Sequence, residues 1–224
     1  MNTGALLLMK SFLSDDDVDR IVERLEALPQ ENWKLVHEAG DYFSDNWQVI
    51  HLIRDNEPTE YFDMFPELKR FRDWCKAHID ILVFYKVKPD SKLHRHRDLS
   101  GTLEVGRLRF HVPLKTNEKC IFEVSKIPLK MVKGDIWALN TSYLHAVENN
   151  SNQDRIHLVA QVEVNEWAWS LLPKRNWKYY GHAIFFSLIV AKKAITSLLT
   201  NPKLIKKRFH QGKFFLRRFF TASR

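Results

Sequence analysis

The sequence predicts a mainly β protein with flanking helices, built as an antiparallel sandwich or barrel. Residues 79–87 are rich in β-branched and aromatic side chains, which favour strands. Residues 107–114 alternate between apolar side chains and basic or other residues, the period-two pattern of a strand with one buried face. Turn residues at 134–135 and 149–152 separate further short apolar runs. We therefore expect many short antiparallel strands joined by turns.

Shorter runs complete the predicted sheets. An opening strand and turn are expected at residues 5–13, and alternating apolar side chains indicate one or two strands within 33–53. Later short apolar runs also have the length and composition of strands. They are 121–124, 129–132, 136–139, 145–148 and 156–164.

Two helices are predicted before the main strands. Ser14 is typical of an N-cap, Asp17 stands at the position of a capping-box partner, and apolar residues follow at helical spacing until Pro29. A second helix is expected to begin at Pro66. The residues on its apolar face are Leu68, Phe71 and Cys75.

The basic excess of the chain lies entirely in its last quarter. The 224 residues carry a formal net charge of +8. Of the 35 basic residues, 13 lie within 167–224, which holds no Asp or Glu, leaving 22 in the rest of the chain against all 27 acidic residues. We therefore predict a β domain with N-terminal helices over 1–166 and a basic, aromatic-rich helical extension over 167–224.

The extension has the composition of a surface helix. Its longest apolar run, 182–191, is too short to cross a bilayer, which takes about 20 residues. Basic and bulky apolar residues at helical spacing favour peripheral contact of 174–224 with an anionic membrane. A basic helical cap folded onto the core is an equal alternative. Nucleic acid is a less favoured partner, because the paired phenylalanines suit insertion or packing at least as well as base stacking.

Cysteine usage and the amino terminus bear on the compartment. The two cysteines, Cys75 and Cys120, form neither a disulfide framework nor a cysteine-rich zinc site, and they fit a reducing cytoplasm. Residues 1–10 lack a basic region and a cleavage site, so no signal peptide is expected. The expected location is the cytoplasm, either free or peripheral at the inner face of a membrane.

A candidate metal site is the strongest chemical signal in the sequence. His96 and Asp98 are two apart, which places both on one face of a strand, and His145 supplies a third ligand. Two histidines and one carboxylate make the facial triad of non-haem Fe(II) oxygenases. Arg155, ten residues beyond His145, suits a carboxylate of a bound co-substrate. His94 shares the face of His96 in a regular strand, so a His94/His96 pair is an alternative.

One face of the predicted strand 107–114 is basic. Arg107, Arg109 and His111 alternate with apolar residues and so point to the same side. A face of two arginines and a histidine indicates the lining of an anion pocket.

The order and spacing of these residues resemble the 2-oxoglutarate/Fe(II)-dependent dioxygenases, and most closely their aspartyl/asparaginyl β-hydroxylase-like branch. The resemblance covers residues 79–162. It is carried by four motifs, namely His96-Arg97-Asp98, 107–114, 134–140 and 145–149 leading to 155–158. It implies a double-stranded β-helix, the jelly roll of cupin-like proteins, backed by the early helices.

The resemblance also implies the cofactors. Fe(II) would be held by the three catalytic ligands, with 2-oxoglutarate as co-substrate and O₂ as oxidant. Arg155 would pair with the distal carboxylate of 2-oxoglutarate, and Arg109 and His111 would contact the co-substrate or the substrate. Tyr85 and Ser91 are further candidate donors to the co-substrate carboxylate.

The implied reaction is hydroxylation of a C–H bond in an amino acid, a peptidyl residue or an amide-bearing lipid, with succinate and CO₂ as co-products. Substrate identity and oligomeric state have no signature in the sequence. The alternative is a non-catalytic, cupin-like metal-binding module tethered to a membrane by its basic tail. The complete ligand set together with Arg155 favours the enzyme.

Overall fold

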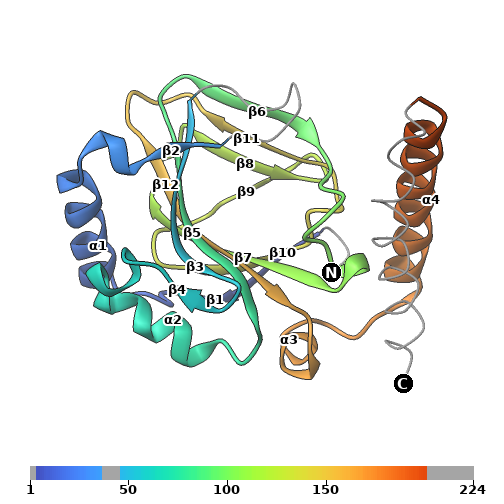
Figure 1. The fold of residues 1–224 in the computed structure, drawn as a ribbon, viewed down its shortest axis with the longest axis horizontal. Helices are drawn as coiled ribbons and strands as arrows, with labels where there is room; N and C mark the ends of the chain where they lie inside the picture. Colours follow the sequence, from blue (N-terminus) through green and yellow to red (C-terminus); the bar gives the residue numbers. More distant parts are fainter. Residues whose placement is uncertain (1–3, 37–45, 201–224) are drawn as a thin grey trace.

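The structure is a computed structural model that describes residues 4–36 and 46–200. Within them, two antiparallel sheets face each other (Figure 1). The larger sheet has the strand order β1–β10–β7–β12–β5–β3–β2, with β4 paired to β3. Its strands are β1 (Ala5–Met9), β2 (Lys34–Leu35), β3 (Trp47–Arg54), β4 (Glu57–Pro58), β5 (Ile79–Val87), β7 (Arg107–Lys115), β10 (Ile136–Leu139) and β12 (Arg155–Glu163).

The smaller sheet has the order β6–β11–β8–β9. Its strands are β6 (Ser91–His96), β8 (Cys120–Val124), β9 (Ile127–Leu129) and β11 (His145–Asn149). From β5 to β12 the chain passes repeatedly from one sheet to the other, and this winding is the double-stranded β-helix. The predicted fold class is confirmed.

Most predicted strands lie where the sequence pattern placed them, but β9 begins earlier than the expected run at 129–132. Val124 pairs with Ile127, so β8 and β9 are joined by the two-residue turn of Ser125 and Lys126. Both turn residues have positive φ, 54° and 65°. Such turns usually carry Gly or Asn, and their absence from the sequence hid the hairpin.

Both predicted helices form. In α1 (Asp15–Ala27) the Ser14 Oγ accepts a hydrogen bond from the Asp17 backbone N–H at 3.1 Å, and the helix ends before Pro29. A 3₁₀ turn from Pro66 leads into the short α2 (Lys69–Trp74). The buried residues of this second segment are Leu68, Phe71 and Cys75, as predicted.

The main core lies between the helices and the outer face of the larger sheet. In Figure 1, α1 and α2 cover one side of this sheet. Phe71 of α2 packs edge-on against Phe110 of β7 with the ring centroids 6.4 Å apart, and both side chains are fully buried. Each such ring contributes about 1.5–3 kcal/mol through burial. A second, smaller core between the two sheets includes Leu93, Phe122 and Val147.

Between β12 and residue 200 the structure describes two helices, α3 (Glu166–Ser170) and α4 (Trp177–Thr200). Trp167 and Ala168 of α3 pack against the main core. The segment 101–106 holds a 3₁₀ turn at Leu103–Val105, in which Leu103 and Glu104 are buried. None of the helices that the structure describes combines the length and apolarity needed to span a membrane.

Candidate active site

Three of the sequence-predicted residues converge at one end of the space between the sheets. One potential ligand atom from each of His96, Asp98 and His145 lies within 4.8 Å of the other two. His96 Nε2 is 3.4 Å from Asp98 Oδ1, and the two imidazole rings are 4.2 Å apart between centroids. His96 pairs with His145 across β6 and β11, which is why residues so distant in sequence meet. The predicted triad is therefore assembled.

Backbone carbonyls orient both imidazoles. His96 Nδ1 is 2.8 Å from the carbonyl oxygen of His94, and His145 Nδ1 is 3.0 Å from that of Tyr143. A carbonyl only accepts, so each Nδ1 carries a proton, and in a neutral ring Nε2 then keeps its lone pair. Burial lowers the pKa of His145 to about 4, which keeps its ring neutral. Neutral imidazoles fixed by a second hydrogen bond are the form that binds metals.

A β-bulge separates His94 from His96. Val147 pairs with Leu93 and His145 pairs with His96. Between these two pairs β6 advances by three residues and β11 by two. His94 is consequently exposed on the outer face of the smaller sheet. The alternative His94/His96 pair is wrong, because the alternation that it needs breaks at the bulge.

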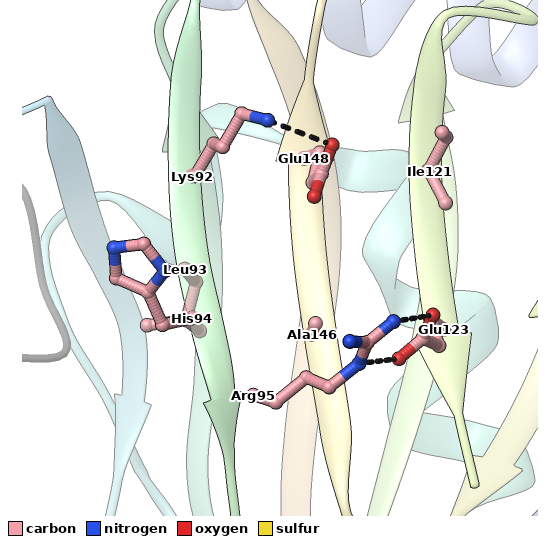
Figure 2. Close-up of a pocket in the computed structure, with 8 residues that line it drawn as sticks. All are labelled: Lys92, Leu93, His94, Arg95, Ile121, Glu123, Ala146 and Glu148. Atoms are coloured by element: carbon pink, nitrogen blue, oxygen red, sulfur yellow. Dashed lines mark hydrogen bonds and ion pairs between the residues drawn. The ribbon is translucent and has the colours of Figure 1, made fainter. Parts of the chain in front are cut away.

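The outer face of the smaller sheet carries a separate surface pocket. Its volume is about 390 Å³, and it lies over β6, β11 and β8 (Figure 2). Lys92 pairs with Glu148 at 3.2 Å and Arg95 with Glu123 at 2.8 Å across these strands. Its charged residues are thus already matched, and the triad does not line it.

Asp98 is held by its backbone and by a partly buried arginine, Arg109. The Asp98 N–H donates to the Thr141 carbonyl at 3.0 Å, which ties Asp98 to the loop before His145. Arg109 Nη1 donates to Asp98 Oδ2 at 2.7 Å, and Arg109 Nη2 to Gln161 Oε1 at 3.2 Å. Burial raises the pKa of Asp98, but Arg109 and the two imidazoles outweigh it and hold that pKa well below its usual range. Asp98 stays ionised, with Oδ1 turned to His96.

Arg109 forms bonds within the protein, and its contact with the co-substrate or the substrate stays a prediction. Its guanidinium is bonded to the ligand carboxylate and to Gln161. Arg107 on the same strand is also engaged, because it forms ion pairs with Asp80 and with Glu163. Of the three residues on the basic face of β7, His111 is the one whose polar side-chain atoms have no partner among the described residues, so it is available to bind an anion.

Arg155 is buried without an acidic partner. Only 3% of its surface is exposed, and no carboxylate among the described residues pairs with it. Its Nη2 is 3.2 Å from His157 Nδ1, and its guanidinium lies over the Phe122 ring at 5.6 Å. Burial lowers the pKa of Arg155 to about 10, so it remains charged at neutral pH. A buried, unpaired guanidinium is costly unless an anion binds it.

Two buried histidines complete the surroundings of Arg155. The ring of His111 lies 6.0 Å from that of His157 and 5.4 Å from that of Phe122. Both ring nitrogens of His111 and Nε2 of His157 are buried without a hydrogen-bond partner in the described structure. Burial lowers the pKa of both histidines well below 6.5, helped by Arg109 and Arg155 at His111 and by Arg155 at His157. Neutral imidazole rings whose donor and acceptor nitrogens are unbonded can form hydrogen bonds to a polar ligand.

Sequence reasoning missed two positioning residues, while the roles of Ser91 and Tyr85 stay predictions. Asn140 was quoted only as part of a motif, yet its side chain accepts from the Leu103 N–H at 3.2 Å and so joins the loops that bear the ligands. Phe122 had no signal beyond its place in a strand. Ser91 donates its hydroxyl to the Pro89 carbonyl at 3.0 Å, and the partly buried Tyr85 packs against Trp47 at 5.6 Å.

The residues fit a divalent metal and a dicarboxylate. Two nitrogen donors and one carboxylate leave coordination positions open on a metal. The unpaired guanidinium of Arg155 and the unbonded ring nitrogens of His111 and His157 fit a bound anion. That anion would lie near the metal ligands, because His111 is within electrostatic range of both His145 and Arg155. The donor set and the anion pocket together suit a metal that is chelated by an acidic co-substrate.

Comparisons with known proteins agree with this geometry. The sequence model of the family described as "Aspartyl/Asparaginyl beta-hydroxylase" matches residues 15–164. A search of curated protein sequences finds no match.

Solved structures share the fold at low sequence identity. An oxidoreductase of the 2OG-Fe(II) oxygenase family from Burkholderia pseudomallei has a TM-score of 0.50 and 15% identity, over 72% of this chain and 85% of that one. HygX from Streptomyces hygroscopicus, with nickel and 2-oxoglutarate bound, has a TM-score of 0.50 and 12% identity, over 74% and 84%. The non-heme α-ketoglutarate-dependent epimerase SnoN, from nogalamycin biosynthesis, has a TM-score of 0.51 and 13% identity, over 71% and 77%.

The family match contains both metal-bearing segments, the buried His111 and Arg155. From this match and the assembled triad it follows that the chain belongs to the aspartyl/asparaginyl β-hydroxylase family and is a 2-oxoglutarate-dependent Fe(II) oxygenase of the hydroxylase type.

Proposed function

We propose that the protein hydroxylates an unactivated aliphatic C–H bond of an amino acid, a peptidyl residue or an amide-bearing lipid. One observation carries the proposal. The triad of His96, Asp98 and His145 stands beside a buried guanidinium, Arg155, that has no acidic partner among the described residues. A metal-binding module without catalysis would have no use for that costly charge.

The chain's own residues bind and orient the reactants. When bound, Fe(II) supplies with 2-oxoglutarate and O₂ the oxidising power that hydroxylates the substrate and leaves succinate and CO₂. Two neutral imidazoles and one carboxylate leave the centre at a net charge of about +1, which favours a dianionic co-substrate. Arg155 would neutralise the distal carboxylate, and the neutral His111 and His157 offer hydrogen bonds beside it.

An apolar wall next to the anion pocket supports an aliphatic substrate. Val159 pairs with His111 on one side and with Val83 on the other, so all three share the inner face of the larger sheet. Val49 joins the two valines in one cluster, and Tyr85 packs against it. These valines are buried, so the cluster would exclude water from a hydrocarbon group bound next to it.

Succinate formation tests the proposal. Purified protein is incubated with Fe(II), ascorbate, 2-oxoglutarate and panels of amino acids, peptides and acylated amino-acid lipids. Products are followed as succinate and as substrate that gains one oxygen atom. Replacing His96, Asp98 or His145 by alanine should abolish both signals, because each change removes a ligand. Unchanged succinate formation in any of these three variants would end the assignment.

His94 provides the matched control. It is the same residue type, only two positions from His96, but it lies on the outer face of the sheet. His94→Ala should therefore keep succinate formation within about twofold of the parent chain, as expected for an exposed residue away from the site. A loss equal to that of His96→Ala would show that the bulge has been assigned to the wrong histidine.

A further inference from the structure

Helix α4 presents two different faces. Ala183 and Phe186 are buried against the domain, whereas every residue from 191 to 196 is exposed. In Figure 1 the helix stands at the side of the molecule opposite α1 and α2. One face of α4 is thus a packing surface and the rest of it meets solvent.

The packed face rests on the loops that carry the metal ligands. The ring of His182 stacks on Tyr143 at 3.6 Å, and its Nε2 is 2.8 Å from Ser142 Oγ. Arg97, between the ligands of the first motif, lies over the ring of Phe185 at 5.5 Å. Since a helix with its side chains is about 10 Å thick, whatever binds the outer face of α4 lies close to the active site.

The outer face is a continuous apolar stripe. We call the α4 stripe the set of exposed residues at spacings of three, four or seven, which fall on one side of the helix. They are Trp177, Tyr180, Ile184, Leu188 and Ile195. Trp177 is 76% exposed, Leu188 65% and Ile184 61%. Large apolar side chains that line up in solvent mark an interaction surface.

Charge indicates what that surface binds. From residue 167 onward the chain has 13 Lys or Arg and no acidic residue, and Lys178, Lys192 and Lys193 are exposed on α4 itself. Residues 201–224 continue the composition, with eight basic residues and five phenylalanines. A protein partner of mixed charge would not require a segment that is basic throughout. A membrane with anionic headgroups over hydrocarbon matches both the basic charge and the apolar stripe.

We propose that the α4 stripe docks the protein on an anionic lipid surface. The stripe enters the boundary between headgroups and acyl chains, while the long lysine side chains reach back to the headgroups. The metal-bearing loops then lie directly above the lipid. This inference concerns the surface alone and stands whether or not the proposed reaction is correct.

Vesicle sedimentation of the full chain tests the inference. Vesicles of phosphatidylglycerol and phosphatidylcholine are compared with vesicles of phosphatidylcholine alone. The double variant Ile184→Glu/Leu188→Glu should lower partitioning onto anionic vesicles by about tenfold or more, because two inserted side chains become charged. The parent chain should bind pure phosphatidylcholine more weakly, and high salt should weaken its binding to anionic vesicles.

A matched control isolates position from charge. Leu35 in β2 and Met64 just before α2, 41% and 42% exposed, belong to the side of the molecule opposite α4 (Figure 1), and Leu35→Glu/Met64→Glu adds the same two negative charges. This control should lower partitioning by less than about threefold, as expected from the added charge alone. Equal loss in both double variants, or no binding of the parent chain to anionic vesicles, would overturn the inference. So would a dimer in solution that Ile184→Glu/Leu188→Glu dissolves, since a second copy would then cover the stripe.

Trp177 gives a readout that does not depend on a charged variant. Its fluorescence, taken as the difference between the parent chain and Trp177→Phe, should be quenched by bromine-labelled lipids in anionic vesicles. Unquenched Trp177 fluorescence on bound protein would place the stripe away from the lipid and refute the docking mode. Thermal unfolding of every variant, measured in parallel, excludes a loss of folding as the cause.

Discussion

Replacing Arg155 by methionine should weaken 2-oxoglutarate binding. When no 2-oxoglutarate is present, the same replacement should stabilise the fold. Removing one partner of a buried charge pair costs about 2–5 kcal/mol, so we expect the KM for 2-oxoglutarate to rise by at least about 30-fold. The buried guanidinium has a pKa of about 10 in place of 12.5. At about 1.4 kcal/mol for each pKa unit, its burial costs about 3 kcal/mol.

The gain in stability is smaller than that cost. Methionine gives up the contact with Phe122 and the hydrogen bond to His157, which are worth about 1–2 kcal/mol together. A net gain of about 1–2 kcal/mol raises the Tm of a domain of this size by about 2–8 °C. Thermal unfolding with Mn(II), with and without 2-oxoglutarate, measures both effects. The parent chain should gain about 2.7 kcal/mol at 100 times Kd, and the variant should gain far less.

Arg107→Met is the control. Arg107 is paired with Asp80 and Glu163, so its loss leaves two carboxylates unmatched and should lower stability while KM for 2-oxoglutarate stays within about twofold. If Arg155→Met instead destabilised the protein and kept the parent KM, the guanidinium would be a structural residue and the anion pocket would be misassigned.

Three further substitutions probe other parts of the structure. Arg109→Met frees Asp98 from its fixed orientation and should weaken Mn(II) or Fe(II) binding about 10- to 100-fold in a metal titration; unchanged affinity would contradict the positioning role. Gly134→Ala places a Cβ 2.4 Å from the Leu13 carbonyl oxygen at a φ of +79°, so urea unfolding should show a loss of about 2 kcal/mol or more, and a neutral result would refute the backbone geometry. Burial lowers the pKa of His182 to about 4 from 6.5, so the unfolded chain takes up a proton that the folded chain does not. Stability should fall as the pH drops from 6.5 to 4, and His182→Gln should fall less steeply in urea unfolding at several pH values; identical slopes would refute the burial of His182.

The loops beneath α4 connect these predictions. Asn140 joins the segment of Leu103 to the loop before His145, and His182 of α4 contacts the same loop through Ser142. The metal site therefore depends on loops that are held from two sides. We therefore expect that a change in the packing of α4 disturbs the triad through this loop and weakens metal binding.

Local pattern was enough to predict much of the fold. The period-two pattern of 107–114, the Ser14 cap and the apolar spacing after Pro66 depend on neighbours within a few residues, and each was confirmed. The ligand set and Arg155 were predicted through the resemblance of their order and spacing to a known family, while the chemistry of iron and carboxylates made the residue types suitable.

Only the tertiary structure decided which of these residues meet. The bulge that removes His94 from the site exists through pairing of β6 with β11, about 50 residues further along the chain. Arg109 bonds to Asp98 because the loop that carries Asp98 lies next to β7. The ring nitrogens of His111 are unbonded because the described residues around them place no donor or acceptor within reach. Composition and periodicity specify side chains and the faces they occupy, whereas partners are set by contacts between distant segments, and those contacts exist only once the two sheets have packed.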